Sequence, residues 1–185
     1  PDCTVSKDWR NLMAAGDLDG VIIATPPTIH AEMTLAAIDA GLPVLVEKPM
    51  TLSLAEAETV VGAALAKNAI VMVNHIHLYS AAWEVLKREA KEHGPLQAIS
   101  TVAGNWGPFR QDTPMLWDWG THDVAMCLDL VGRRPETAIA RRIETRDVDN
   151  GIGEALGLVL GFGDITAKIA ISNLISEQNR LFTAS

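Results

Sequence analysis

The sequence predicts a mixed α/β fold, in which a parallel sheet is followed by an α+β part with a mostly antiparallel, open sheet. In residues 1–74, short continuous apolar runs alternate with amphipathic segments, a pattern typical of parallel strands joined by helices. Later in the chain, two apolar runs are separated only by Gly163-Asp164, as in an antiparallel hairpin. We therefore expect two domains, residues 1–74 and 75–185, with a boundary between 74 and 80.

The first domain is predicted to alternate between helices and strands. We expect a helix over 5–16, a strand over 19–24, a helix from 28 to about 40, a strand over 43–46, a helix from 54 to about 68 and a strand over 70–73. Thr28 and Ser53 can each cap the helix that follows, and Glu56 completes a capping box with Ser53. Such a parallel sheet is expected to have helices on both faces.

The second domain has a different order of elements. We expect helices over 81–93 and 116–131 and strands over 96–104, 137–145, 154–162 and 165–172. Gly94-Pro95 stops the first of these helices, and Asp149-Asn150-Gly151 is a turn signal.

Composition excludes several classes of function. The net charge is -8 and no cluster of Lys and Arg occurs, which argues against binding to nucleic acid or to a membrane surface. No apolar run approaches the ~20 residues that span a bilayer, and the polar start does not look like a signal peptide. Cys3 and Cys127 lie far apart and are expected to be free thiols of a cytoplasmic protein.

Polar or conformationally constrained residues follow each strand of the first domain. The three segments are Thr25-Pro26-Pro27 with His30, Glu47-Lys48-Pro49, and Asn74-His75-Ile76-His77. Ligands of open parallel sheets bind beyond the carboxyl ends of the strands, so these segments together predict a binding site. A simple turn is the alternative for each segment taken alone.

Lys48 is the most informative residue of the three segments. Beside Glu47 it can be partly desolvated and still remain charged, which suits a donor to a substrate oxygen. A surface ion pair is the alternative. Pro49 fixes the direction of the chain after the lysine.

A second candidate site is the segment from Trp117 to Asp123. Asp118 and His122 are four residues apart and therefore share a face of a helix. A carboxylate orients an imidazole and favours its protonated form, which suits a proton acceptor that works near neutral pH. A helix N-cap for Asp118 and a capping or core role for His122 are the alternatives.

Two further interpretations of these residues are a metal site and the wall of a pocket. His75, His77, His122 and Asp118 could supply metal ligands, but no motif fixes the set and we expect no metal. The aromatic loop that contains Trp106 and Arg110 could wall a polar pocket, or it could be a packed connection.

With these residues in this order, the chain resembles the Gfo/Idh/MocA oxidoreductases, the family of glucose-fructose oxidoreductase and inositol dehydrogenase. Glu47-Lys48-Pro49 is similar to the family's motif at the end of a Rossmann strand, and Asp118-x-x-x-His122 is similar to its active-site helix. Ala24-Thr25-Pro26-Pro27 with His30 resembles the preceding loop that contacts the cofactor. The resemblance extends over nearly the whole chain.

The resemblance implies NAD or NADP as cofactor, and hydride transfer to or from a hydroxyl-bearing carbon of a sugar, a sugar nucleotide or a cyclitol. Lys48 would bind the reacting oxygen, His122 would exchange its proton, and Asp118 would support both. The cofactor would contact Thr25, Pro26, Pro27, His30, Glu47, Lys48 and Pro49. The small polyol or sugar substrate would meet His75, His77, Trp106, Arg110 and Trp119.

The chain also departs from the family's pattern. The phosphate-binding G-x-G-x-x-G sequence is not in these residues, and Gly151-Ile152-Gly153 does not precede a predicted helix. We therefore expect an internal piece of a longer enzyme, which comprises the C-terminal part of a Rossmann domain and an incomplete second domain. The residue that selects NAD or NADP would lie outside it.

The residues are also compatible with two other functions, a non-catalytic sugar or dinucleotide regulator of the same fold and a metal-dependent hydrolase. Members of the family often associate through the outer face of the second domain's sheet. An apolar run such as Leu158–Phe162 would need covering there, so we expect a homo-oligomer of the complete protein.

Overall fold

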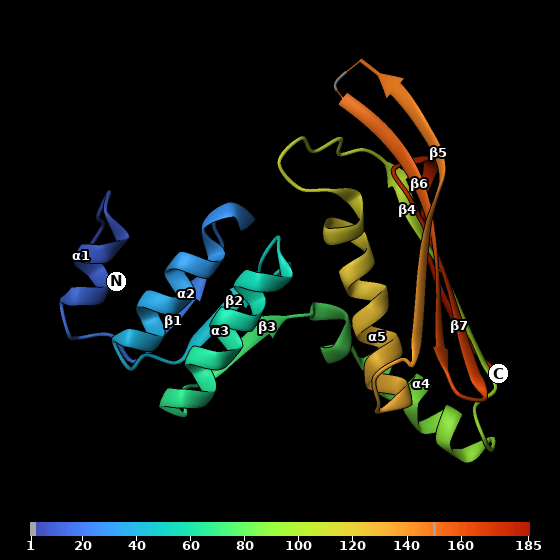
Figure 1. Cartoon of the computed structure of the whole chain (residues 1–185), viewed down its shortest axis with the longest axis horizontal. Helices are drawn as coiled ribbons and strands as arrows, with labels where there is room; N and C mark the ends of the chain where they lie inside the picture. The colour runs from blue at the N-terminus through green and yellow to red at the C-terminus, as the bar shows by residue number, and fades with distance from the viewer. Residues whose placement is uncertain (1–2, 150) are drawn as a thin grey trace. The chain divides into compact units, whose positions relative to one another are not determined.

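The computed structural model describes residues 3–149 and 151–185. The chain divides into two compact units, residues 1–74 and residues 75–185 (Figure 1). The first contains a parallel sheet and the second a mostly antiparallel one, so the predicted fold class is confirmed.

The first unit is built on the three-stranded sheet A. Its strands are β1 (Val21–Ile23), β2 (Val44–Glu47) and β3 (Val71–Asn74), which run parallel in the order β1-β2-β3. Ile23 lies opposite Val46, and Val46 opposite Val73, so all three strands end at the same edge of the sheet.

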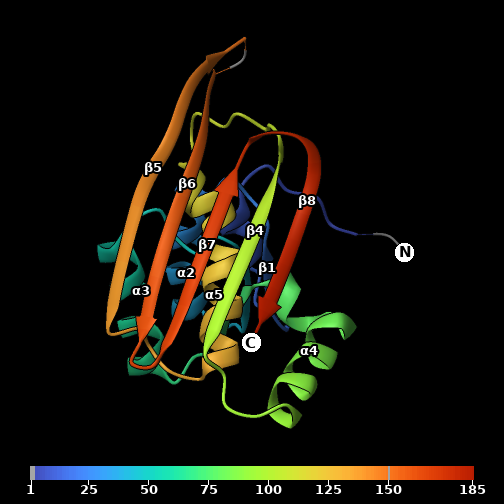
Figure 2. The same cartoon turned by 90° about the vertical axis from the view of Figure 1, so that its right-hand side faces the viewer.

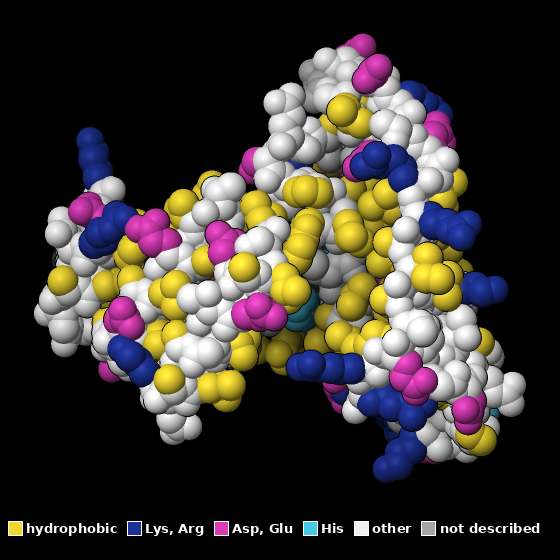
Figure 3. All heavy atoms as spheres, viewed as in Figure 1, with side chains coloured by type: hydrophobic (Ala, Val, Ile, Leu, Met, Phe, Trp, Pro, Cys, Tyr) yellow, Lys and Arg dark blue, Asp and Glu magenta, His cyan; other side chains and the backbone are white. Residues whose placement is uncertain are grey.

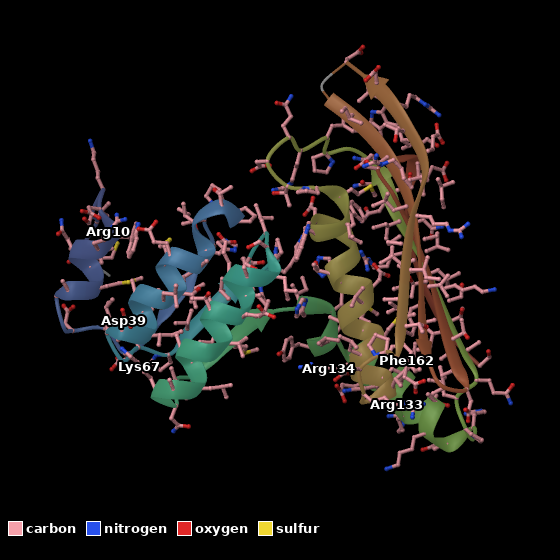
Figure 4. The ribbon with its side chains drawn as sticks, viewed as in Figure 1. Arg10, Asp39, Lys67, Arg133, Arg134 and Phe162 are labelled. Carbon is pink, nitrogen blue, oxygen red and sulfur yellow. The ribbon has the colours of Figure 1, made fainter. Side chains whose placement is uncertain are left out.

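Helices α1 (Trp9–Ala14), α2 (His30–Asp39) and α3 (Leu54–Lys67) complete this unit, with the short 3₁₀ helix η1 (Pro27–Ile29) before α2. Met33 and Ala37 of α2 pack on Ile23 and Val46 of the sheet, where apolar burial drives the packing. Lys67 Nζ lies 2.8 Å from Asp39 Oδ1 and links α3 to α2 (Figure 4). The predicted cap of α3 is confirmed, because the Ser53 hydroxyl accepts a hydrogen bond from the backbone N–H of Glu56.

Two predicted helix starts are wrong. The first helix begins at Trp9 rather than at residue 5, because the Asp8 side chain accepts from the backbone N–H of Arg10 and so caps the helix. Thr28 does not cap α2, because it lies inside η1. Prolines 26 and 27 fix φ there and favour a separate tight turn before the α-helix begins at His30.

The prediction that helices cover both faces of sheet A is also wrong for the described residues. Helices α2 and α3 pack against each other and lie on one face of the sheet (Figure 1). Ile22 and Met72 lie in register on the opposite face and are 75% and 40% exposed. Strands in sequential order, joined by right-handed crossovers, place both connecting helices on the same side.

The second unit is built on the five-stranded sheet B (Figure 2). Its strands are β4 (Ala98–Trp106), β5 (Thr137–Val148), β6 (Gly151–Phe162), β7 (Ile165–Ser172) and β8 (Leu174–Ala184), in the order β5-β6-β7-β4-β8. Only the β4–β7 pair is parallel. The predicted turn between β5 and β6 includes Asn150, which lies outside the described residues. Strand β8 was not predicted.

The helical segments of this unit are η2 (Ile76–Tyr79), α4 (Ala81–Glu92), the π-helical turn η3 (Leu116–Gly120) and α5 (Thr121–Val131). Helix α5 lies along one face of sheet B (Figures 1 and 2). Cys127 of this helix packs with Ile99, Leu160 and Ile169 in one buried cluster. After α5, the Arg133 guanidinium donates to the Phe162 carbonyl at the end of β6 (Figure 4).

The face assigned to Leu158–Phe162 needs a correction. Leu158, Leu160 and Phe162 face helix α5 and are buried, so they do not form the open face of the sheet. Because strand side chains alternate, Val159 faces the other way together with its neighbour Ile139. These two side chains are 40% and 55% exposed.

An apolar groove of about 600 Å³ runs between helix α5 and strands β5 and β6. Apolar side chains are visible in this region of the molecular surface (Figure 3). The groove's lining contains no acid and no histidine, so it is not a candidate for proton-transfer chemistry. In the part of the chain that the structure describes, none of the helices combines the length and the apolar character that crossing a bilayer would require.

Two isoleucines on opposite faces of sheet B test this arrangement. Ile169 is 2% exposed and faces α5, whereas Ile139 is 55% exposed. We expect Ile169→Ala to lower the free energy of unfolding by about 2–5 kcal/mol, since it leaves a cavity in the core. Ile139→Ala should cost less than about 1 kcal/mol. Urea unfolding followed by tryptophan fluorescence measures both, and equal losses would contradict the assigned faces.

Candidate functional site

The carboxyl edge of sheet A is held by two hydrogen bonds that the Glu47 carboxylate accepts. Its Oε1 accepts from Asn74 Nδ2 at 2.6 Å, and its Oε2 accepts from the backbone N–H of Lys48 at 3.3 Å. One carboxylate therefore ties the end of β2 to the end of β3 and fixes the backbone at Lys48.

His30 joins the loops that follow β1 and β2. Its ring is 1% exposed, with Nδ1 2.8 Å from the Pro49 carbonyl oxygen and Nε2 2.8 Å from the Thr25 carbonyl oxygen. The buried ring supports the loop backbones on which Thr25 and Pro49 lie.

The residues predicted to contact a cofactor thus differ in their exposure. Thr25, Glu47 and Lys48 are half-buried and Pro26 is exposed. By contrast, Pro27, His30 and Pro49 are buried. The first group is the surface that the edge of sheet A offers to a ligand, and the second group supports it.

In the second unit, Asp118 lies in the π-helical turn η3. Its Oδ2 is 3.3 Å from Arg110 Nε, and its side chain is 12% exposed. Gly120 ends this turn next to β7, and a Cβ there would lie 2.9 Å from Leu116 Cδ1. Glycine at this position therefore leaves room for the Leu116 side chain of the same turn.

His122 lies in the first turn of α5, directly after η3. The ring of His77, from η2, packs against the ring of His122 with a centroid distance of 4.7 Å and an interplanar angle of 69°. This is an edge-to-face arrangement. His75 precedes η2 and is half-buried.

A pocket of about 310 Å³ adjoins Asp118. Its lining comprises Pro108, Arg110, Gln111, Thr113, Pro114, Met115, Asp118, Trp119, Gly151, Ile152, Glu154 and Asn173. The Thr113 hydroxyl is buried and has no hydrogen-bond partner among the described residues. The Asn173 Oδ1 accepts from the backbone N–H of Glu154 at 2.7 Å, which orients the side-chain amide. Hydroxyl and amide groups next to apolar walls are typical of small-molecule sites.

Of the residues predicted to contact the substrate, His75 and His77 lie outside the lining of this pocket. Arg110 and Trp119 line it, whereas Trp106 is 53% exposed, lies outside the lining and packs edge-to-face on Phe109 at 5.4 Å. Thr113, Glu154 and Asn173 were not predicted, because each is an ordinary polar residue in a loop or at a strand end, with no motif around it. Among residues 3–149 and 151–185, no group of three or more His, Cys, Asp or Glu side chains could hold a metal ion.

Comparisons with known proteins connect both units to one kind of enzyme. Residues 1–75 match the model of an oxidoreductase family with an NAD-binding Rossmann fold. The chain is 28% identical over 179 residues to scyllo-inositol 2-dehydrogenase (NADP(+)) IolW of Bacillus subtilis, a match that covers 90% of this chain and 49% of the relative. It is also 28% identical over 177 residues to levoglucosan dehydrogenase of Pseudarthrobacter phenanthrenivorans, covering 84% of this chain and 44% of the relative.

A solved structure is similar to the whole chain. The crystal structure of a Magnetospirillum magnetotacticum protein assigned as an oxidoreductase is 45% identical, with a TM-score of 0.95. The similarity covers 100% of this chain and 60% of that protein. The chain spans about half the length of the curated relatives that it matches.

The bridging role of His30 can be tested by substitution. We expect His30→Ala to lower the free energy of unfolding of the first unit by about 2–4 kcal/mol, because it leaves a cavity and removes two buried hydrogen bonds. Hydrogen exchange at the loops after β1 and β2 should rise with it. His93→Ala is the control, since that side chain is 77% exposed. Unchanged exchange in both loops would contradict the bridge.

Proposed function

Because this chain belongs to the Gfo/Idh/MocA oxidoreductase family, we propose that the whole protein transfers a hydride between NAD or NADP and a hydroxyl-bearing carbon of a sugar, a sugar nucleotide or a cyclitol. The observation that carries the proposal is the pocket beside Asp118, in which polar side chains lie among apolar ones. Its size suits a small ligand. The names of the relatives, an inositol dehydrogenase and a levoglucosan dehydrogenase, point to the same class of substrate.

The residues at the carboxyl edge of sheet A fit the nicotinamide end of such a cofactor. Pro26 offers exposed apolar surface next to the Thr25 hydroxyl, and Lys48 supplies a cation in the next loop. In the proposal Thr25, Pro26, Glu47 and Lys48 contact the cofactor, while Pro27, His30 and Pro49 hold the loops in place. When bound, the cofactor supplies the hydride acceptor or donor.

The remaining chemistry belongs to side chains of this chain. Oxidation of an alcohol requires a group that accepts the hydroxyl proton, and we assign this role to the His122 imidazole. Lys48 Nζ donates a hydrogen bond to the reacting oxygen and so favours its negatively charged form. Asp118, held by Arg110, accepts a hydrogen bond from a neighbouring group of the substrate or orients His122.

The charges around the pocket favour a neutral substrate within this class. The two carboxylates of its lining are both paired with arginines, Asp118 with Arg110 at 3.3 Å and Glu154 with Arg142 at 2.8 Å. A phosphate group entering the pocket would find its one lining cation already engaged by Asp118. We therefore assign a neutral polyol or sugar ring to this pocket.

The outer face of sheet B supports the proposal of a homo-oligomer. Ile139, Ile143, Val159 and Leu181 expose between 40% and 68% of their surface, and Ile139 and Val159 are paired neighbours on this face. Apolar surface of this kind is commonly covered by a partner. A second copy of the protein is the partner that we assign to it.

Replacing the proposed proton acceptor separates an enzyme from a regulator. In the full-length protein, we expect His122→Asn to lower kcat by about 10²–10⁴-fold, because no general base remains, while polyol binding persists. A screen of neutral polyols with NAD and NADP, followed at the absorbance of the reduced cofactor, measures turnover, and calorimetry measures binding.

His93→Asn is the matched control, because this histidine is exposed at the end of α4. Unchanged turnover in His122→Asn would overturn the role given to His122. Binding of polyol and cofactor without turnover in the unsubstituted protein would favour the regulator.

A further inference from the structure

Asp123 is a buried charge that the proposed mechanism does not use. It follows His122 directly, and it is 1% exposed. Its Oδ2 lies 3.3 Å from Nη1 of Arg180, a residue that follows it by 57 positions in the sequence. Burial raises the pKa of Asp123, and the charge of Arg180 opposes this rise. A buried carboxylate is costly unless it is paired, so the arginine from β8 is what allows it to lie under the first turn of α5.

The pair lies near both histidines, because α5 carries Asp123 and His122 and packs against η2, which carries His77. The charge of His77 acts on Asp123 and favours its ionised form. The His77 ring in turn packs edge-to-face on the His122 ring, with centroids 4.7 Å apart. The Asp123–Arg180 ion pair and the His77–His122 ring pair therefore lie on packed elements, since η2 contacts α5. The Arg180 guanidinium also lies 6.0 Å from the ring centroid of Trp119, the residue after Asp118.

We propose that Asp123 and Arg180 are positioning residues that hold His77 against His122 and set the pH at which His122 accepts a proton. This inference rests on the proposed function, since it gives His122 the role of proton acceptor. The reason is electrostatic. The negative charge of Asp123 favours the protonated form of both imidazoles, and the positive charge of Arg180 limits this effect.

The other titratable and charged groups around His122 leave this argument intact. Asp118 of η3 is paired with Arg110, and His75 precedes η2. Cys127 lies one turn after Asp123, and burial raises the pKa of its thiol to about 12, so it stays neutral. Strands β4 and β7 face α5 with Thr101 and with apolar side chains such as Ile99 and Ile169.

Histidine titration tests the proposal without reference to turnover. In the full-length protein with labelled histidines, NMR gives the midpoint of each imidazole, and the His77 and His122 signals are assigned with His77→Gln and His122→Asn. We expect Asp123→Asn to lower both midpoints by about half a pH unit or more, because Arg180 is then left without a counter-charge. Arg180→Met should raise the His77 midpoint, because His77 then becomes the charged partner of Asp123.

Asp129→Asn is the matched control on the same helix. Asp129 bonds Trp83 Nε1 at 2.7 Å and Lys87 Nζ at 3.3 Å, so its loss removes comparable contacts away from His122. Neither His77 nor His122 should shift in this variant. Arg180→Lys keeps the charge and should restore midpoints close to those of the unsubstituted protein.

The pH profile of kcat/KM supplies the second measurement. In the oxidation direction, its acidic limb should move to lower pH in Asp123→Asn, in step with the His122 midpoint. Midpoints that do not move in Asp123→Asn or in Arg180→Met would overturn the inference. Should Asp123→Asn fail to fold, Arg180→Met decides alone. If the midpoints shift while His122→Asn retains full turnover, the charge pair stands and the proposed role of His122 fails.

Discussion

The second unit depends on the contact between helix α5 and the inner face of sheet B. Apolar side chains from β4, β6 and β7 pack on this helix, and their burial fixes its position. The π-helical turn before it packs against β7. Asp118, His122 and Asp123 all lie within this turn and the first turn of α5. The core contact therefore determines where these three side chains of the candidate site lie, and a packed helical element carries them.

The first unit reaches the same result by a different route. Its three strands end together because they are parallel and in register, and the loops that follow them carry the polar residues. Hydrogen bonds from buried or half-buried side chains then hold these loops: His30 links the first loop to the second, and Glu47 links β2 to β3. His30 and Glu47, which the sequence predicted as cofactor contacts, thus form hydrogen bonds within the protein.

Local patterns predicted the elements whose signal is short-range. The strands of sheet A, the Ser53 cap of α3 and the hairpin at Gly163-Asp164 follow from apolar periodicity and from turn chemistry. Strand β8 was missed because Leu174–Ala184 is mainly polar along its middle, and its partner β4 lies far away in sequence. The face of Leu158–Phe162 was assigned wrongly for a related reason. Leu158, Leu160 and Phe162 face helix α5, whereas Val159 between them faces outward. Because all four are apolar, the sequence does not show which of them are buried.

The charged residues of the candidate site have the same non-local character. Three carboxylates, Asp118, Asp123 and Glu154, are each paired with an arginine from another element. None of these pairs has the i,i+3 or i,i+4 spacing typical of an ion pair on one helix, so the sequence pattern does not predict them. Pairing lowers the cost of bringing each carboxylate out of water. Both carboxylates that line the pocket have an arginine partner, and this pairing is what supports the proposal of a neutral polyol as the ligand.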